Sequence, residues 1–542
     1  MCDKEMYLEA QRCDPADADA YLGLGATLSA GERATLSDGR KMGDRELYLE
    51  ALRCDPNHAG AYLGLGTTLA TAESVTLSDG RKMNHKELCI EALRCDPNYA
   101  DAYVSLCAIV PAEEKVTLSD GRKLCNRELC IEALRCDPTN VNAYLGLGTT
   151  LSAGERATLS DGRKLCEREL YIEALRCDPA HANAYFNLGA SLSTGERVTL
   201  SDGRKMCDKE LYLEAQRCDP ADADAYLGLA STLSAGERAP LSDGRKLCKR
   251  ELYLEALRCD PTNANAYHGL ATTLSTGERV TLSDGRKMAE RELYVETLRC
   301  DPDFVDAYFN LGTTLAVKDK MTLSDGRVLG KKELYIEALR CDPNYSRAYF
   351  NLGVILSAGE SVTLSDGRKM AERELYIEAL RCDPTNSNAY LGLGVILSAG
   401  ESVKLGDGRK MSDKELYVEA LRCDPAHANA YFNLGNTLSA GKTVKLKDGR
   451  TLRNWELYIE ALRCDPNHSS AYNNLGTILS PGEKVKLSDG RVLTEEELFI
   501  EALRCDPTDE TALQNLENCS GMSRAEKAEL KKMLAQAAAK RS

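Results

Sequence analysis

The sequence has no long apolar run, no basic segment and neither a CxxC nor an HxxxH pair of metal ligands. No stretch approaches the roughly 18 apolar residues that span a bilayer, and the opening MCDKEMYLEA lacks the charged start and apolar core of a secretory signal. The formal net charge is −15, with acidic and basic residues interleaved. We therefore expect neither a membrane nor a nucleic acid as partner. A cytoplasmic location is expected, with an extracellular one left open if the sequence is a fragment.

Common motifs for metal binding and redox chemistry are also missing. The chain has 22 cysteines but no CxxC and no HxxxH sequence. Four of the six histidines share one position after a proline, which indicates solvated loop residues: His58, His181, His427 and His468. We expect no catalytic residue, no metal site and no cofactor.

One repeated segment makes up nearly the whole chain. The sequence RCDP recurs thirteen times at a spacing of 41 residues, from Cys13 to Cys505, without an insertion or deletion. Such regularity means that every repeat contacts its neighbours in the same way. The pattern predicts a solenoid of about 13 repeats.

Each repeat begins with a predicted first helix. In residues 182–192 the apolar side chains Tyr185, Leu188 and Leu192 share one helical face. A glycine follows in most copies, as expected where a helix ends.

A β-hairpin is predicted next, in VTLSDGRKM. A three-residue Ser-Asp-Gly loop pairs Val198 with Met206 and Thr199 with Lys205, so that apolar and polar side chains face opposite sides. A two-residue Asp-Gly loop would pair leucine with lysine and lose this alternation. Neighbouring hairpins could in principle join into one sheet, but Pro240 cannot donate to a ladder, so separate hairpins are favoured.

The second helix starts at the residue equivalent to Cys207 and ends before Asp-Pro. A glutamate stands three residues after this start in all thirteen copies. Where the first residue is Ser412 or Thr494, the pair predicts a capping box.

The pattern AxAYxNLG, followed by AL and DP, resembles the tetratricopeptide repeat. Tyr185, Leu188 and Gly189 match its first helix, Ala215 is the small packing residue of its second helix and Pro220 its terminator. The hairpin accounts for the seven residues by which each repeat exceeds the usual 34. The resemblance implies a mainly α fold with small β elements, a right-handed α-solenoid of helix–β-hairpin–helix repeats. Residues 1–520 would form the array, starting on a second helix, and residues 521–542 a capping helix.

The RCDP cysteines fall in the last turn of the second helix. We interpret them as buried free thiols in the interface between repeats. Equivalent residues on packed helices lie about 8–10 Å apart, whereas a disulfide needs about 4.4–6.8 Å between Cα atoms, so a disulfide ladder is disfavoured. Reactive or metal-binding thiols are the weaker alternative.

In the family that the chain resembles, first helices line a concave groove that binds peptides or partner helices. The equivalent residues here lie two before, one after and five after the tyrosine of the first helix, and we single out Leu63, Thr67, Leu145, Phe186, Phe309, Phe350, Phe432, Asn142 and Asn183. Packing of these aromatics against the next repeat is an equal alternative. Arg347 is an isolated cation among these positions, which disfavours a clamp for peptide carboxylates.

The repeats are compatible with three functions. The leading one is a non-catalytic scaffold that binds protein or peptide partners in the groove. The alternative is a structural protein that binds copies of itself end to end through its uncapped first face and forms a filament. A thiol redox or metal-binding module is the weakest.

Overall fold

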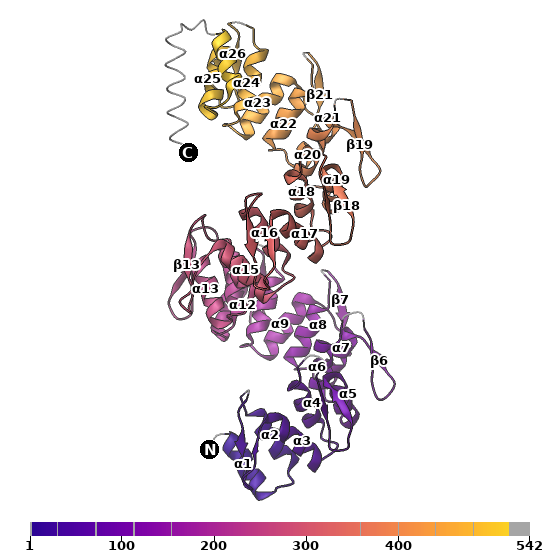
Figure 1. Ribbon diagram of the computed structural model, residues 1–542. Coiled ribbons are helices and arrows are strands. Elements are labelled where there is room, and N and C mark those ends of the chain that lie inside the picture. Colours follow the sequence, from indigo (N-terminus) through magenta and orange to yellow (C-terminus); the bar gives the residue numbers. More distant parts are fainter. Residues whose placement is uncertain are drawn as a thin grey trace. The chain divides into compact units, whose positions relative to one another are not determined.

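The computed structural model describes residues 3–519 except residues 30, 71–72, 112–113, 153, 194, 358, 399, 440 and 481. Within these residues twenty-six helices and short hairpins follow one order throughout: first helix, hairpin, second helix (Figure 1). The chain divides into two compact units, unit 1 with residues 1–273 and 280–287 and unit 2 with residues 274–279 and 288–542. The predicted capping helix lies outside the described residues, and the boundary at residue 520 stays a prediction.

The second helices carry the odd numbers, and a glutamate fixes the start of each from α3 onward. Its carboxylate accepts from the backbone N–H of the N-cap residue, as Glu374 Oε2 does from Ala371 at 2.9 Å. At Ser412 and Thr494 the side chain also accepts from the glutamate's own N–H, which confirms both predicted capping boxes, and Asn84 forms another. The helices are α1 Asp3–Cys13, α3 Asp44–Cys54, α5 His85–Cys95, α7 Asn126–Cys136, α9 Glu167–Cys177, α11 Asp208–Cys218, α13 Lys249–Cys259, α15 Glu290–Cys300, α17 Lys331–Cys341, α19 Glu372–Cys382, α21 Asp413–Cys423, α23 Asn454–Cys464 and α25 Glu495–Cys505.

The first helices carry the even numbers and follow the Asp-Pro turn. Asp383 Oδ1 accepts from the Thr385 N–H at 2.8 Å in that turn, and Asn386 caps the next helix by accepting from Ala389 at 3.0 Å. The helices are α2 Ala18–Ala26, α4 Ala59–Thr67, α6 Ala100–Ile109, α8 Val141–Thr149, α10 Ala182–Ala190, α12 Ala223–Thr232, α14 Ala264–Ala271, α16 Val305–Thr314, α18 Ser346–Ile355, α20 Ser387–Ile396, α22 Ala428–Asn436, α24 Ser469–Ile478 and α26 Glu510–Cys519.

The hairpins have the predicted register. Thr199 pairs with Lys205 and Val198 with Met206, and Gly203 takes the left-handed conformation that the three-residue loop needs, with φ of 85°. Each described hairpin forms a two-stranded sheet of its own, as predicted. The strand pairs are β1 Ala34–Thr35 with β2 Lys41–Met42, β3 Ser74–Thr76 with β4 Lys82–Asn84, β5 Val116–Thr117 with β6 Lys123–Leu124, β7 Arg156–Thr158 with β8 Lys164–Cys166, β9 Arg197–Thr199 with β10 Lys205–Cys207, β11 Arg238–Pro240 with β12 Lys246–Cys248, β13 Arg279–Thr281 with β14 Lys287–Ala289, β15 Lys320–Thr322 with β16 Val328–Gly330, β17 Ser361–Thr363 with β18 Lys369–Ala371, β19 Ser402–Lys404 with β20 Lys410–Ser412, β21 Thr443–Lys445 with β22 Thr451–Arg453, and β23 Lys484–Lys486 with β24 Val492–Thr494.

Within each unit the core is a stack of the same side chains. Tyr349 and Leu352 of a first helix are 1% and 0% exposed, and Leu334 and Ala338 of a second helix are 0% exposed. Each repeat therefore buries its apolar face against its neighbours, as in a solenoid. None of the described helices is long and apolar enough to cross a membrane.

Candidate functional site

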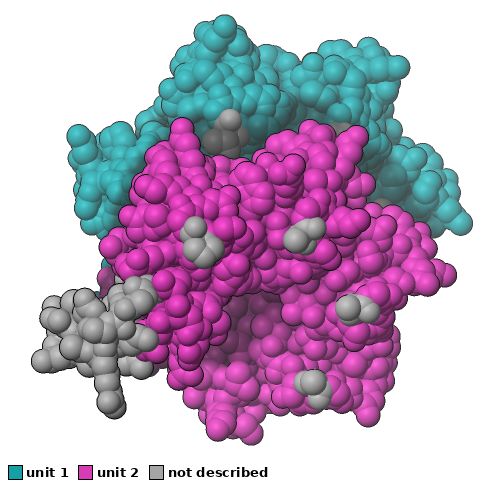
Figure 2. Space-filling model, turned by 90° about the horizontal axis from the view of Figure 1, so that it is seen from above, with its two compact units in different colours: residues 1–273, 280–287 teal, residues 274–279, 288–542 magenta. Residues whose placement is uncertain are grey.

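First helices of consecutive repeats contact one another inside each unit. In unit 1, α2 contacts α4 and α10 contacts α12; in unit 2, α18 contacts α20 and α20 contacts α22. No two consecutive second helices in the described residues are equally close. Within each unit the first helices are therefore the more closely packed of the two sets of helices. The space-filling view shows that unit 2 is hollowed (Figure 2).

We call the side chains two before, one after and five after the first-helix tyrosine the first-helix face. The singled-out residues differ in how far they are accessible there: Thr67, Asn142 and Asn183 are exposed, Leu63, Phe186, Phe350 and Phe432 are half-buried, and Leu145 and Phe309 are buried. The two buried side chains support this face but offer a ligand little surface. Binding by any of the nine stays a prediction.

The phenylalanines of this face pack on the tyrosine of the second helix that follows. The ring centroid of Phe186 lies 5.6 Å from that of Tyr212, and the centroid of Phe350 lies 5.7 Å from that of Tyr376. These aromatics therefore pack within their own repeat, which differs from the packing against the next repeat that the sequence left open. Phe186 and Phe350 also keep part of their surface exposed.

Phe309 is enclosed more completely. Its ring lies 5.4 Å from that of Tyr345, edge to face, and the guanidinium carbon of Arg347 lies 4.4 Å from its centre. Arg347 Nη1 also donates to the Tyr345 hydroxyl at 3.2 Å. The one cation singled out on this face is thus held against aromatic rings.

In several described repeats the residue two before the tyrosine contacts the next repeat. His58 Nε2 lies 2.9 Å from Asp19 Oδ1, and His468 Nε2 lies 3.1 Å from Asn429 Oδ1. His468 Nδ1 meanwhile accepts the Ala471 N–H at 3.3 Å and so caps α24.

The interpretation of the histidines as solvated loop residues is therefore wrong for these two. They are half-buried N-caps that bridge neighbouring repeats. Burial lowers the pKa of His468 and of His427, which lies 3.1 Å from Asn388. Sequence reasoning missed this role because each partner lies 39 residues earlier.

Two neighbouring first helices carry exposed aliphatic side chains. Val354 in α18 is 55% exposed and Val395 in α20 is 58% exposed, and both stand five residues after the buried tyrosine. Half-buried Phe350 and Leu391 belong to the same face. Both valines belong to the predicted face by their distance from the tyrosine, but sequence reasoning singled out neither. The available signal was valine at one position in consecutive repeats, where most copies have Ala, Thr, Ser or Asn.

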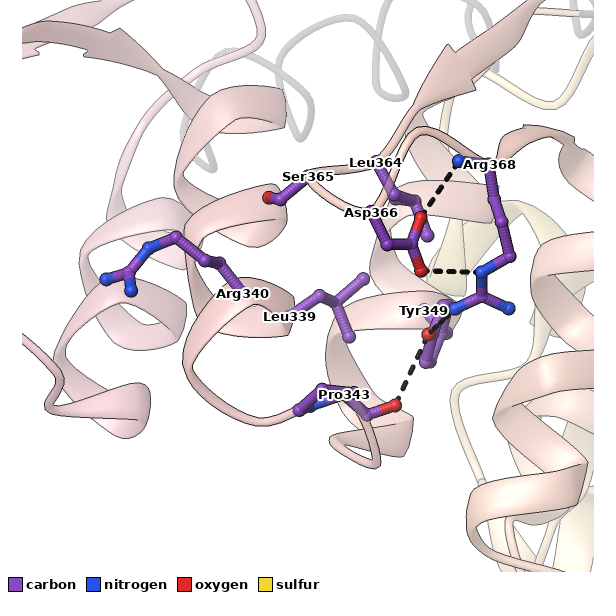
Figure 3. Close-up of a pocket in the computed structure, with 8 residues that line it drawn as sticks. All are labelled: Leu339, Arg340, Pro343, Tyr349, Leu364, Ser365, Asp366 and Arg368. Carbon is purple, nitrogen blue, oxygen red and sulfur yellow. Dashed lines mark hydrogen bonds and ion pairs between the residues drawn. The ribbon is translucent and has the colours of Figure 1, made fainter.

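A recurrent pocket lies between the hairpin and the two helices. One copy, of about 250 Å³, is lined by Leu339, Arg340, Pro343, Tyr349, Leu364, Ser365, Asp366 and Arg368 (Figure 3). Similar pockets occur beside Tyr390, Tyr431 and Tyr472.

Three polar side chains of this pocket, Tyr349, Asp366 and Arg368, are joined by hydrogen bonds. The Tyr349 hydroxyl donates to the Pro343 carbonyl at 3.3 Å and accepts from Arg368 Nη2 at 2.9 Å, while Arg368 Nε donates to Asp366 at 2.6 Å. The backbone and guanidinium N–H groups of Arg368 lower the pKa of Asp366. The arrangement fastens the hairpin to the first helix, and its charges are already paired.

The structure corrects the interpretation of the RCDP thiols. They are half-buried or exposed rather than buried, because the end of the second helix reaches the surface. Cys259 Sγ lies 3.8 Å from the carbonyl oxygen of Pro220 in the preceding repeat, so the predicted location between repeats is confirmed in this example. The described residues contain no cluster of three or more metal-binding side chains.

One pair of thiols is arranged differently. Sγ of Cys130 in α7 lies 2.8 Å from Sγ of Cys107 in α6, and both residues are buried. The search for CxxC could not find this pair, since its members lie 23 residues apart on two helices.

Comparison with known proteins adds a family match. A family model described as tetratricopeptide repeat matches residues 252–292, 334–374, 416–453 and 457–495. The remaining copies share the same period of 41 residues with these segments. No curated protein matches the sequence.

Solved structures with similar helical repeats are distant in sequence. YrrB, described as a TPR protein with an unusual peptide-binding site, is 16% identical over 41% of this chain and 97% of its own, with a TM-score of 0.25. Yeast Tom70 is 13% identical over 92% of each chain, with a TM-score of 0.29. The APC/C hetero-tetramer Cut9–Hcn1 is 14% identical over 94% of this chain and 88% of that chain, with a TM-score of 0.37.

Proposed function

Because the chain belongs to the tetratricopeptide repeat family, we propose that it is a non-catalytic scaffold that binds a peptide or helix of a partner protein along the first-helix face. One observation carries the proposal: Val354 and Val395 are both more than half exposed on neighbouring first helices. Adjacent exposed aliphatic side chains are typical of a surface that a partner covers.

The neighbouring side chains support an apolar ligand. Phe350 and Leu391 provide half-buried surface one residue after each tyrosine, and Arg347 is fixed by Phe309 and Tyr345. A ligand with apolar side chains could cover the two valines. It would not have to break the contacts of Arg347 with Phe309 and Tyr345.

The proposal can be tested with peptides selected from a random display library on the full chain. Affinity is then measured by calorimetry for the wild type and for Val354→Asn with Val395→Asn. Asparagine is compatible with this position because Asn436 occupies it in the next repeat. In the proposed complex the ligand buries both valines, so replacing them should weaken binding by about tenfold or more.

The matched control is Val328→Lys, which changes an exposed valine in hairpin strand β16, 56% exposed, to the lysine of the equivalent Lys369 and Lys410. It should leave the affinity unchanged. An equal loss in both variants, or no selected peptide at all, would contradict binding at the first-helix face. Light scattering over a range of concentrations tests self-assembly, because end-to-end association makes the particle mass grow with concentration and groove binding does not.

A further inference from the structure

In most repeats a small residue of the first helix faces an aromatic ring of the following second helix. At Gly148 an added Cβ would lie 2.4 Å from Cε1 of Tyr171, so the ring occupies the space of a side chain. Gly312 and Tyr335 repeat this contact, with an added Cβ 2.6 Å from the ring. Glycine and tyrosine therefore form a complementary pair.

In one repeat both members of the pair are replaced at once. Cys107 stands where the equivalent first helix has Gly148, and Cys130 stands where the equivalent second helix has Tyr171. Cys89 replaces the tyrosine alone: Gly66 keeps its glycine, and the ring of His85 takes the space beside it, with an added Cβ 2.7 Å from Cδ2. The double replacement brings two thiols into direct contact.

The contact is buried. Cys107 is 9% exposed and Cys130 is 0% exposed, with 2.8 Å between their sulfur atoms. The side chains of two cysteines together are smaller than the side chain of one tyrosine. The reduced cysteine pair therefore fills this interface less completely than the glycine and tyrosine pair does in other repeats.

We propose that Cys107 and Cys130 are a redox site that forms a reversible disulfide between α6 and α7, with a small hydroperoxide as oxidant. A small oxidant is required because only Cys107 retains accessible surface. The bond joins α6 and α7, the two helices of one repeat that the hairpin β5–β6 connects in sequence.

The chemistry has two steps. The thiolate sulfur of Cys107 attacks one peroxide oxygen, the O–O bond breaks, and Cys107 becomes a sulfenic acid while the other oxygen leaves as an alkoxide that takes up the thiol proton. The sulfur of Cys130 then attacks Sγ of Cys107 and expels the sulfenic oxygen as water, which carries away the Cys130 proton. Overall, two thiols and one hydroperoxide give one disulfide, one alcohol and one water.

The local electrostatics assign the order of attack. The hydrogen bond from the Cys130 thiol lowers the pKa of Cys107, while the same contact and burial raise the pKa of Cys130. At the helix ends, burial raises the pKa of Cys136 and Cys177. Selectivity for the pair therefore comes from thiolate character at Cys107 and from a partner already in contact.

The test treats the full-length protein with hydrogen peroxide, blocks the remaining thiols with an alkylating reagent and maps the peptides by mass spectrometry. We expect a cross-linked peptide with Cys107 and Cys130 at peroxide concentrations that leave Cys136 and Cys177 alkylated. Dithiothreitol should reverse it, and amide exchange in α6 and α7 should be several-fold slower in the oxidised protein.

The control restores the pair used elsewhere, Cys107→Gly with Cys130→Tyr. This variant should fold with unchanged circular dichroism and show no change in amide exchange on oxidation. The proposal is overturned if peroxide oxidises Cys136 or Cys177 first, if Cys107 pairs with another cysteine, or if both thiols stay alkylatable. It is equally overturned if the oxidised wild type exchanges in α6 and α7 as fast as the reduced protein.

Discussion

At the scale of single residues, two N-cap histidines of unit 2 contact the preceding repeat, and His468 also caps its own helix with its side chain. His427 and His468 lie at the N-caps of α22 and α24, each within hydrogen-bonding distance of an asparagine of the preceding repeat. At His468, Nδ1 accepts the Ala471 N–H while Nε2 donates to Asn429 Oδ1. These two roles require the neutral imidazole that carries its proton on Nε2. Protonation removes the acceptor.

This arrangement predicts an acid-sensitive interface. Burial lowers the pKa of both histidines, so the unfolded chain takes up protons first as the pH falls below about 6.5. The stability is complete above that pH and decreases as the pH falls towards the lowered pKa of the folded state. Amide exchange of α22 and α24 should therefore become faster between neutral pH and about pH 5.5, after correction for intrinsic exchange rates.

The control is His427→Asn with His468→Asn, since Asn386 caps α20 at the equivalent position. This variant should lose the dependence in that pH window. If the wild type and the variant respond equally, the histidines do not carry the effect.

The thiols show why residue-scale roles were hard to predict. The sequence places Cys259 in the last turn of its helix but does not reveal that this turn reaches the surface. It also cannot show that Cys107 meets Cys130, because the contact depends on how two helices cross. Hydrogen bonds over 39 residues, such as that of His58, likewise require the stacking of repeats.

At the scale of elements, local chemistry predicts the structure well. The Ser-Asp-Gly loop determined the pairing of Thr199 with Lys205, and Ser412 with Glu415 formed the predicted capping box. Both depend on residues within a few positions of one another, which is why the sequence alone was sufficient. The cap at Asn84 was missed although it follows the same rule.

The N-cap residue is alanine in α19 and serine in α21, the next second helix. Substitutions at these two positions should therefore have opposite effects on the stability of the two helices. Ala371 has the glutamate half of the capping box, with its N–H donating to Glu374 at 2.9 Å, but no side-chain acceptor. Ala371→Ser should stabilise α19 by about 1 kcal/mol, and Ser412→Ala should destabilise α21 by about the same amount. The free energy of local opening from amide exchange measures both.

Each variant has the other helix as its internal reference, because both helices keep the glutamate and differ in the N-cap side chain. No change in either helix would show that the glutamate provides the whole cap.

At the scale of the whole molecule, repetition explains the fold of the described residues. Identical repeats place the same side chains at the same positions, so a specialised surface arises only where copies diverge. The fold class followed from the period of 41 residues. The exposure of the predicted first-helix face did not follow as fully, because Phe309 proved buried and Val395 exposed, which depends on neighbours in three dimensions.

Photo-crosslinking can locate a partner on the first-helix face without relying on any substitution. A peptide selected on the full chain is synthesised with a benzophenone side chain and irradiated in the complex, and the attachment sites are mapped by mass spectrometry. We expect attachment to α18 and α20, around Phe350, Val354, Leu391 and Val395. Attachment confined to the second helices or hairpins would show that partners bind elsewhere.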